Sequence, residues 1–218
     1  MLFAVAVLAV LSVRSLDEPG ASTTESTSSD VASAGPAEAV TPTVHRHTRH
    51  TGSVLIVGDS LAVGADKFGL SKILKTDGWR VEVDAEESRS TRSGVAAMLA
   101  RDSVPALVLV ELGTNPSAAL STFPDELRQM LDALYERGAE RVIWVTPHHR
   151  DDDRYDARGQ AIFDAAAEDN RLVVADWHAY ASGHREWMRP DGLHYTDTGY
   201  AILAAFLTDI VDANDPNP

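Results

Sequence analysis

Three residues of this sequence have the side chains that attack on an ester requires: Ser60, Asp191 and His194. A serine hydroxyl attacks a carbonyl carbon when a base removes its proton, and an acid must orient that base. In Asp191-x-x-His194, one turn of chain can bring the carboxylate beside Nδ1 and leave Nε2 directed away from it. We therefore predict that Ser60 is the nucleophile, His194 the base and Asp191 the orienting acid.

The same chemistry requires N–H donors for the negative charge that develops on the carbonyl oxygen. Three groups lie at suitable points of the chain: the backbone N–H of Ser60, a backbone N–H in the Ser88 loop, and the side-chain amide of Asn115. We predict that these donors form the oxyanion hole. The supporting residues of the two turns are predicted to be Gly58, Asp59 and Gly113.

Each of these residues also has a structural interpretation. A serine after a strand often caps a helix, and an asparagine after a strand often stabilises its own turn. Asp191 can cap a turn while His194 lies on the surface. The occurrence of all four residues, each after a predicted strand or before the last helix, favours the catalytic interpretation.

Composition limits the other classes of function. The chain has 218 residues, with 33 acidic and 19 basic side chains and a formal charge of −14. This charge repels phosphate backbones, so nucleic acid is not an expected partner. The absence of cysteine excludes disulfides, thiolate metal sites and cysteine nucleophiles. We expect one folded domain, monomeric, without a cofactor or metal ion.

The N-terminal region predicts a location outside the cytoplasm. Residues 2–13 are almost all apolar, but a helix that spans a bilayer needs about 20 such residues. The run is typical of a signal peptide or of the end of a membrane anchor, and a buried core helix is the alternative. The predicted organisation is a signal or anchor segment, a disordered tether rich in Ser, Thr, Pro and Ala, a folded domain and a flexible tail, at 1–14, 15–52, 53–212 and 213–218.

Two groups of histidines raise the question of a metal site. The first comprises His45, His47 and His50 at the end of the tether, and the second is the pair His148 and His149. Neither group has partners at a spacing that fixes a coordination geometry. We therefore interpret the first as a solvated linker end, and the second as a solvated loop near the rim of the site.

Other residues near the predicted site have competing interpretations. His178 and His184 are alternative bases, but neither has an acid three residues before it. Trp177, Trp187 and Tyr195 flank the site and could stack on a sugar ring or acyl group, or pack beneath the loop.

Strand and helix patterns alternate along the folded part. Predicted strands are continuous apolar runs at 54–57, 80–84, 106–112, 142–145 and 172–175. Predicted helices lie at about 61–75, 94–101, 124–137, 157–168 and 198–212. This alternation predicts a three-layer α/β/α sandwich around a five-stranded parallel sheet, with reactive groups beyond the carboxyl ends of the strands.

Three motifs carry a resemblance to a known family. Gly58-Asp59-Ser60-Leu61, Gly113-Thr114-Asn115 and Asp191-x-x-His194 occur in the order found in SGNH, or GDSL, hydrolases. The resemblance covers about Ser53 to Val211. It implies a flavodoxin-like sheet and metal-independent ester hydrolysis or acyl transfer.

The sequence departs from that family at two positions. Ser88 stands where a glycine is usual, and Pro116 stands where many members have an aspartate. Only the backbone N–H is required at the first position, so a serine serves if its backbone conformation permits.

The apolar segment, the tether and the run from Arg89 to Gly94 resemble extracytoplasmic SGNH domains linked to glycan O-acetyltransferases. This resemblance implies an esterase or acyltransferase for short acyl, chiefly acetyl, esters of cell-surface or extracellular carbohydrate, acting through an acyl-enzyme on Ser60. A non-catalytic glycan-binding module is the alternative. A nucleotide binder is disfavoured because no glycine-rich phosphate loop with a lysine follows the first strand.

Overall fold

The computed structural model describes residues 50–115, 120–152 and 154–217. The predicted segment 1–14, the tether up to residue 49 and Pro116 lie outside the described residues. Within the described part of the chain, no helix is long and apolar enough to cross a membrane.

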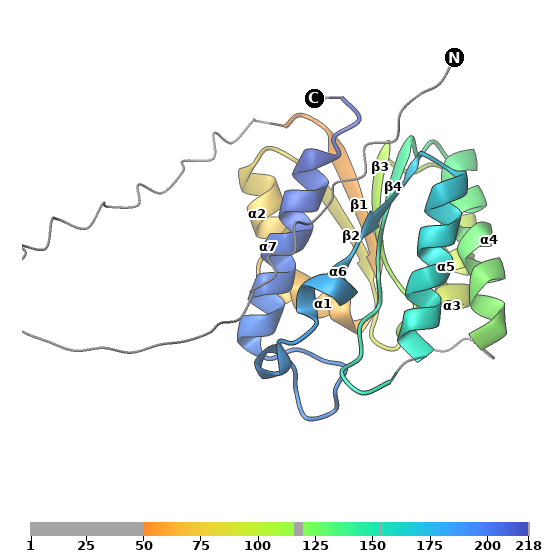
Figure 1. The fold of residues 1–218 in the computed structure, drawn as a ribbon. Helices are drawn as coiled ribbons and strands as arrows, with labels where there is room; N and C mark the ends of the chain where they lie inside the picture. Colours follow the sequence, from red (N-terminus) through yellow and green to blue (C-terminus); the bar gives the residue numbers. More distant parts are fainter. Residues whose placement is uncertain (1–49, 116–119, 153, 218) are drawn as a thin grey trace, which may run out of the picture. The chain divides into compact units, whose positions relative to one another are not determined.

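A five-stranded sheet forms the centre of the fold (Figure 1), and all its strand pairs are parallel. The strand order is β2-β1-β3-β4-β5, the flavodoxin-like order that the sequence predicts. The strands are β1 (Ser53–Gly58), β2 (Arg80–Ala85), β3 (Leu107–Glu111), β4 (Arg141–Val145) and β5 (Leu172–Ala175).

Helices cover both faces of this sheet, which confirms the predicted three-layer sandwich. Figure 1 shows α1, α2, α6 and α7 on one face, with α3, α4 and α5 on the other. The helices are α1 (Ser60–Lys67), α2 (Leu70–Thr76), α3 (Thr91–Leu99), α4 (Phe123–Glu136), α5 (Arg154–Glu168), α6 (Trp177–Ala181) and α7 (Asp197–Ala213). Two 3-10 turns, η1 (Leu120–Thr122) and η2 (Arg185–Trp187), complete the described elements.

Strand β1 contributes to the apolar core on both sides of the sheet. Val54 and Ile56 pack on the side of α1 and α7, whereas Leu55 and Val57 pack on the side of α3 and α4. All four side chains are fully buried. Each contributes about 1.5–3 kcal/mol by its removal from water, so β1 is firmly held and its end is a rigid place for a reactive residue.

The order in which successive strands are added to the sheet reverses at β1. Strand β2 pairs with one edge of β1 and β3 pairs with the other. The carboxyl ends of β1 and β3 are therefore neighbours, with Gly58 opposite Glu111. Ligand sites of such sheets lie at this switch point, and Ser60 and Asn115 follow these two strands.

Two details of the helices differ from the prediction. The predicted helix 61–75 consists of α1 and α2, because Gly69 has a φ of +123° that a right-handed helix cannot contain. Gly94 was predicted to start a helix but lies inside α3, which Ser90 caps by accepting a hydrogen bond from the Ser93 N–H.

The boundaries of the folded part also extend beyond those predicted. His50 stacks on Trp79 with ring centroids 4.6 Å apart, and its Nδ1 lies 2.7 Å from Asp215 Oδ2. The His50 N–H also donates to the carbonyl of Asp77. Residue 50 was assigned to the tether and residue 215 to the flexible tail, but tertiary contacts hold both against the domain.

We expect His50→Ala to lower the free energy of unfolding by about 1–3 kcal/mol, because the stack on Trp79 and the hydrogen bond to Asp215 are both lost. Urea denaturation measures this change. His184→Ala is the matched control, since His184 also stacks on a tryptophan and contacts a carboxylate but is 45% exposed. An equal loss in both variants would contradict a specific role for the His50 contacts.

Candidate functional site

Ser60 is the first residue of α1, immediately after the buried strand β1. Asp59 caps this helix, since its Oδ1 accepts the Leu61 N–H at 2.9 Å. The turn is tight because a Cβ on Gly58 would lie 2.2 Å from the Ala62 Cβ, so only glycine fits there. Gly58 and Asp59 thus shape the turn that precedes Ser60, and Asp59 rather than Ser60 supplies the cap.

His194 meets Ser60 although the two residues are 134 positions apart in the chain. Its Nε2 lies 3.1 Å from Ser60 Oγ. Its Nδ1 lies 2.9 Å from Asp191 Oδ2. An ionised carboxylate only accepts hydrogen bonds, so Nδ1 carries the hydrogen and Nε2 of the neutral ring can accept the serine proton. The arrangement can activate a hydroxyl for attack.

Asp191 is held in its charged form by its own loop. Partial burial raises its pKa, but the N–H groups of Leu193 and His194 and the His194 imidazole outweigh this and lower the pKa of Asp191 to about 2. Both N–H groups donate to Asp191 Oδ1 at 3.0 Å. The carboxylate therefore stays ionised, and its second oxygen remains for the imidazole.

Asp59 links the ends of β1 and β3. It is fully buried, and its Oδ2 accepts hydrogen bonds from the Thr114 hydroxyl and, at 3.0 Å, from the Asn115 amide. Burial raises the pKa of Asp59, while the hydrogen bonds from Thr114, Leu61 and Asn115 oppose that rise. These contacts join the turn before Ser60 to the loop that carries Asn115.

Side chains of α5 hold the loop that carries Asn115 in place. Gly113 has a φ of +121°, which favours glycine. Its carbonyl accepts a hydrogen bond from the buried Arg158 guanidinium, and Tyr155 donates to the Thr114 carbonyl at 3.0 Å. Sequence reasoning missed Arg158 and Tyr155; their spacing of three residues in the first turns of α5 is the available signal.

The Asn115 amide itself is held by several acceptors. Besides Asp59, its Nδ2 donates at 3.3 Å to the Arg89 carbonyl and at 3.3 Å to Thr114 Oγ1. These two bonds are longer than usual for N–H···O contacts, so one amide N–H can turn to donate a hydrogen bond to a substrate oxygen at small cost.

Ser88 has a backbone conformation that is rare for its residue type. Its φ is +63°, and it is the one non-glycine residue of the described ranges with a positive φ. The left-handed region costs an L-residue about 1–2 kcal/mol. Within the described part of the chain its N–H has no hydrogen-bond partner. Ser88 can thus adopt the glycine-like turn that its predicted role requires.

One cleft of about 370 Å³ brings the predicted residues together. Ser60, Ser88, Asn115 and His194 all line it. The remaining lining residues were not predicted: Val63, Gly64, Lys67, Phe68, Glu87, Arg189 and Tyr200. Four of the lining residues follow the helical spacing i, i+3, i+4 and i+7 from Ser60, so the period of α1 was the signal that could have identified them.

Glu111 is a second buried carboxyl beneath the nucleophile helix. Its side chain accepts the Ala62 N–H, and its carbonyl accepts the Asp59 N–H at 3.2 Å. Complete burial, and then the charge of Asp59, raise its pKa well above the usual value. Glu111 therefore ties β3 to both sides of Ser60. It was missed because it reads as part of an apolar strand.

Arg150 supports the loop of the acid and base from the opposite side. Its N–H donates to the Gly192 carbonyl at 2.9 Å. Its guanidinium donates to the carbonyls of Arg189 and Pro190 at 3.4 and 3.1 Å. Arg150 therefore holds the loop that carries Asp191 by donating hydrogen bonds to three main-chain carbonyls of that loop.

His148 and His149 do not form the solvated loop that was expected. His148 is 6% exposed, and its Nδ1 lies 3.2 Å from His178 Nδ1. His148 and His149 line a separate pocket of about 290 Å³ together with His178. Among the described residues, no group of three or more His, Asp or Glu side chains could hold a metal ion.

Burial of His148 predicts a loss of stability in acid. Burial, followed by the neighbouring His178 and His149, lowers its pKa from 6.5 to about 4, although Asp156 acts in the opposite direction. The unfolded chain therefore binds a proton that the folded protein resists. Stability should fall as the pH drops from about 6.5 to about 4, by at most about 3 kcal/mol from this residue.

We expect His148→Gln, whose side chain does not titrate between about pH 7 and about pH 4, to lose less stability over this interval than the wild type. Urea denaturation at both pH values measures the difference. His184→Gln is the control, because His184 is exposed and pairs with Glu186. Parallel losses in wild type and His148→Gln would refute the prediction.

The other candidates occupy structural positions. His178 and His184 pair with His148 and Glu186 rather than with Ser60. Trp177 and Tyr195 are buried and joined by a 2.6 Å hydrogen bond, which agrees with the packing interpretation. Half-buried Trp187 stacks on His184 and does not line the cleft.

Comparison with known proteins places this geometry among related folds. No protein-family model matches the chain. The peptidoglycan O-acetyltransferase OatA of Listeria monocytogenes is 25% identical over 159 residues, which cover 72% of this chain. The match spans 23% of that relative, so the chain corresponds to less than a quarter of its length.

Solved structures with the same fold include two bacterial proteins. The OatA C-terminal catalytic domain of Streptococcus pneumoniae, with a methylsulfonyl adduct, gives a TM-score of 0.61 at 23% identity, covering 74% of this chain and 93% of that one. A lipase/acylhydrolase of Enterococcus faecalis gives 0.63 at 21% identity, covering 77% and 99%. At these identities the similarity establishes the fold.

Proposed function

We propose that the chain is a serine esterase or O-acyltransferase for short acyl esters, in particular acetyl esters of carbohydrate, and that it acts outside the cytoplasm. The observation that carries this proposal is the unbroken contact from Asp191 through His194 to Ser60 Oγ, at 2.9 and 3.1 Å. Ser88 and Asn115 line the same cleft.

In the first half-reaction, Ser60 Oγ attacks the ester carbonyl carbon while its proton passes to His194 Nε2. The carbonyl oxygen becomes negative and is stabilised by the N–H groups of Ser60 and Ser88 and by the Asn115 amide. Asp191 stabilises the imidazolium. When the carbon–oxygen bond to the leaving alcohol breaks, that oxygen takes the proton from Nε2, and an acyl-enzyme remains on Ser60.

The second half-reaction reverses these roles. An incoming hydroxyl gives its proton to His194 Nε2, its oxygen bonds to the acyl carbon, and Ser60 Oγ leaves with the proton. Water as the acceptor yields a free acid, and a sugar hydroxyl yields a new ester. Both outcomes use the same residues, so only the acceptor separates an esterase from a transferase.

The nature of the substrate is inferred from two further features. The relative from Listeria monocytogenes is named a peptidoglycan O-acetyltransferase, which supports acetyl transfer to a glycan. The cleft is rimmed by Lys67, Glu87 and Arg189, polar side chains that suit a hydrated carbohydrate better than a long acyl chain. The apolar segment 1–14 supports a location outside the cytoplasm.

The test is to incubate the chain with an acetyl ester donor and with oligosaccharide fragments, and to follow acetate by mass spectrometry. We expect an acetyl group on Ser60 in a quenched sample. At longer times we expect either free acetate or an acetyl group on the sugar. A fluorophosphonate probe should label Ser60. Glycan binding with neither acetyl release nor probe labelling would support a non-catalytic binding module and reject the enzyme.

A further inference from the structure

The turn that carries Ser88 is closed by main-chain bonds at both ends. The Arg89 N–H donates to the Glu86 carbonyl at 3.2 Å, which makes Ser88 the third residue of a four-residue turn. A positive φ at this position is typical of glycine. The Glu86 N–H donates to the Gly58 carbonyl at 3.2 Å, so the turn starts against the end of β1.

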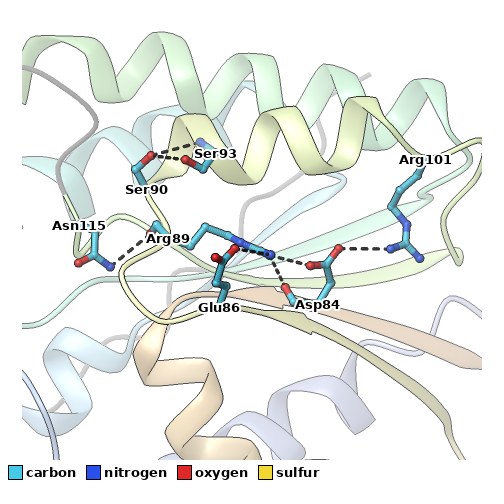
Figure 2. A network of polar contacts seen from close by, with 7 residues as sticks. All are labelled: Asp84, Glu86, Arg89, Ser90, Ser93, Arg101 and Asn115. Carbon is cyan, nitrogen blue, oxygen red and sulfur yellow. Dashed lines mark hydrogen bonds and ion pairs between the residues drawn. The ribbon is translucent and has the colours of Figure 1, made fainter.

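The Arg89 side chain folds back over this turn (Figure 2). Its Nη1 lies 2.8 Å from Asp84 Oδ1 and 2.6 Å from the Asp84 carbonyl, while Nη2 lies 3.5 Å from Glu86 Oε2. The side chain is only 9% exposed. The guanidinium therefore joins Arg89, the residue after Ser88, to Asp84 and Glu86, which precede Ser88.

Asp84 is itself anchored. Arg101, beyond the end of α3, lies with Nη1 3.3 Å from Asp84 Oδ2 and also pairs with Glu82. Asp84 thus binds an arginine through each carboxylate oxygen, and the acceptor that holds Arg89 is fixed to β2 and to the chain that follows α3.

Arg89 also connects two of the predicted oxyanion donors, the Ser88 turn and the Asn115 side chain. Its carbonyl accepts the Asn115 amide at 3.3 Å (Figure 2). The next residue, Ser90, caps α3. One residue therefore holds the Ser88 turn through its side chain and orients Asn115 through its carbonyl.

We propose that Arg89 is a positioning residue, whose bonds to Asp84 and Glu86 hold Ser88 in the left-handed turn that leaves its N–H available to the oxyanion. The inference rests on the proposed function. A glycine at position 88 would adopt this turn unaided. A serine needs the bonds from Arg89 to Asp84 and Glu86, which we call the clamp. Arg89 thereby compensates for the side chain at position 88.

The experiment combines Arg89→Ala with Ser88→Gly. Arg89→Ala should lower kcat for an acetyl ester about 10- to 100-fold with little change in KM, because a transition-state donor is displaced. Adding Ser88→Gly should restore about tenfold of that loss, because glycine adopts a positive φ without the clamp. A mutation that merely loosens the fold would not be rescued by a glycine.

Two further variants control for folding. Arg141 is also partly buried, and its Nη1 donates to Asn214 Oδ1 at 3.4 Å, away from the residues that line the cleft. Arg141→Ala should lower stability but leave kcat unchanged. Arg89→Lys keeps the charge but not the planar fork, so it should show a smaller loss in kcat that Ser88→Gly also relieves.

A crystal structure of Arg89→Ala reads the φ of Ser88 whether or not the protein is active. We expect it to become negative, and a value still near +63° would overturn the inference, as would a kcat equal to that of wild type. If wild type and Ser60→Ala hydrolyse esters equally, the proposed function fails, while the φ of Ser88 still decides the role of Arg89.

Discussion

Ser60→Ala is expected to lower kcat/KM for p-nitrophenyl acetate by at least about 10⁴-fold, because the variant lacks the oxygen that forms the acyl-enzyme. His194→Ala should cause a loss of similar size, because the 3.1 Å contact to Ser60 Oγ makes it the proton acceptor. The double variant should lose little more than either single variant, because residues that act as a unit are not additive. Steady-state kinetics on purified, folded variants measure all three.

Ser182→Ala is the matched control for this series. Its hydroxyl donates to the His178 carbonyl at 2.6 Å, beside the second pocket, and it does not line the cleft with Ser60. The same substitution there should leave kcat/KM unchanged. Wild-type-like turnover by folded Ser60→Ala would refute the mechanism.

Asn115→Ala should have the second largest effect. Loss of one oxyanion donor costs about 10²- to 10³-fold in kcat, with KM little changed because the donor acts mainly on the transition state. The amide is already oriented by Asp59 at 3.0 Å, so it can act without a large rearrangement. Hydrolysis of a series of acetyl esters, with separate kcat and KM values, measures the effect.

Asn115 also supports Asp59, so a control must separate the two roles. Thr114→Ala removes another hydrogen bond to the same Asp59 oxygen while Asn115 is retained. We expect a comparable loss of stability but a much smaller loss of kcat. Equal losses of kcat in the two variants would mean that Asn115 acts only through Asp59.

The predicted fold was accurate because its signals are local. Continuous apolar runs such as 54–57 and 142–145 become buried parallel strands. In α4, Leu127, Met130 and Leu134 repeat with the helical period and are all buried. The break at Gly69 and the short α6 were missed, because such short segments have too few residues to show a period.

The order of the three motifs along the chain predicted which residues of the site would meet. Parallel strands end at one edge of a sheet, so residues that follow β1 and β3 must become neighbours once the strand order is known. The structure brings Ser60, Asn115 and His194 into one cleft, and their catalytic roles stay predictions for the experiments above.

The sequence by itself therefore determined the architecture, the edge of the sheet that carries the site and the identity of the candidate nucleophile, acid and base. Only the tertiary structure decided how Ser88 adopts a positive φ, why His148 is buried, and which of Arg89, Arg150 and Arg158 holds each loop. Hydrophobic periodicity depends on neighbours in the chain. A guanidinium that binds a distant carbonyl or carboxylate depends on positions in space, which exist only after the sheet has brought the loops together.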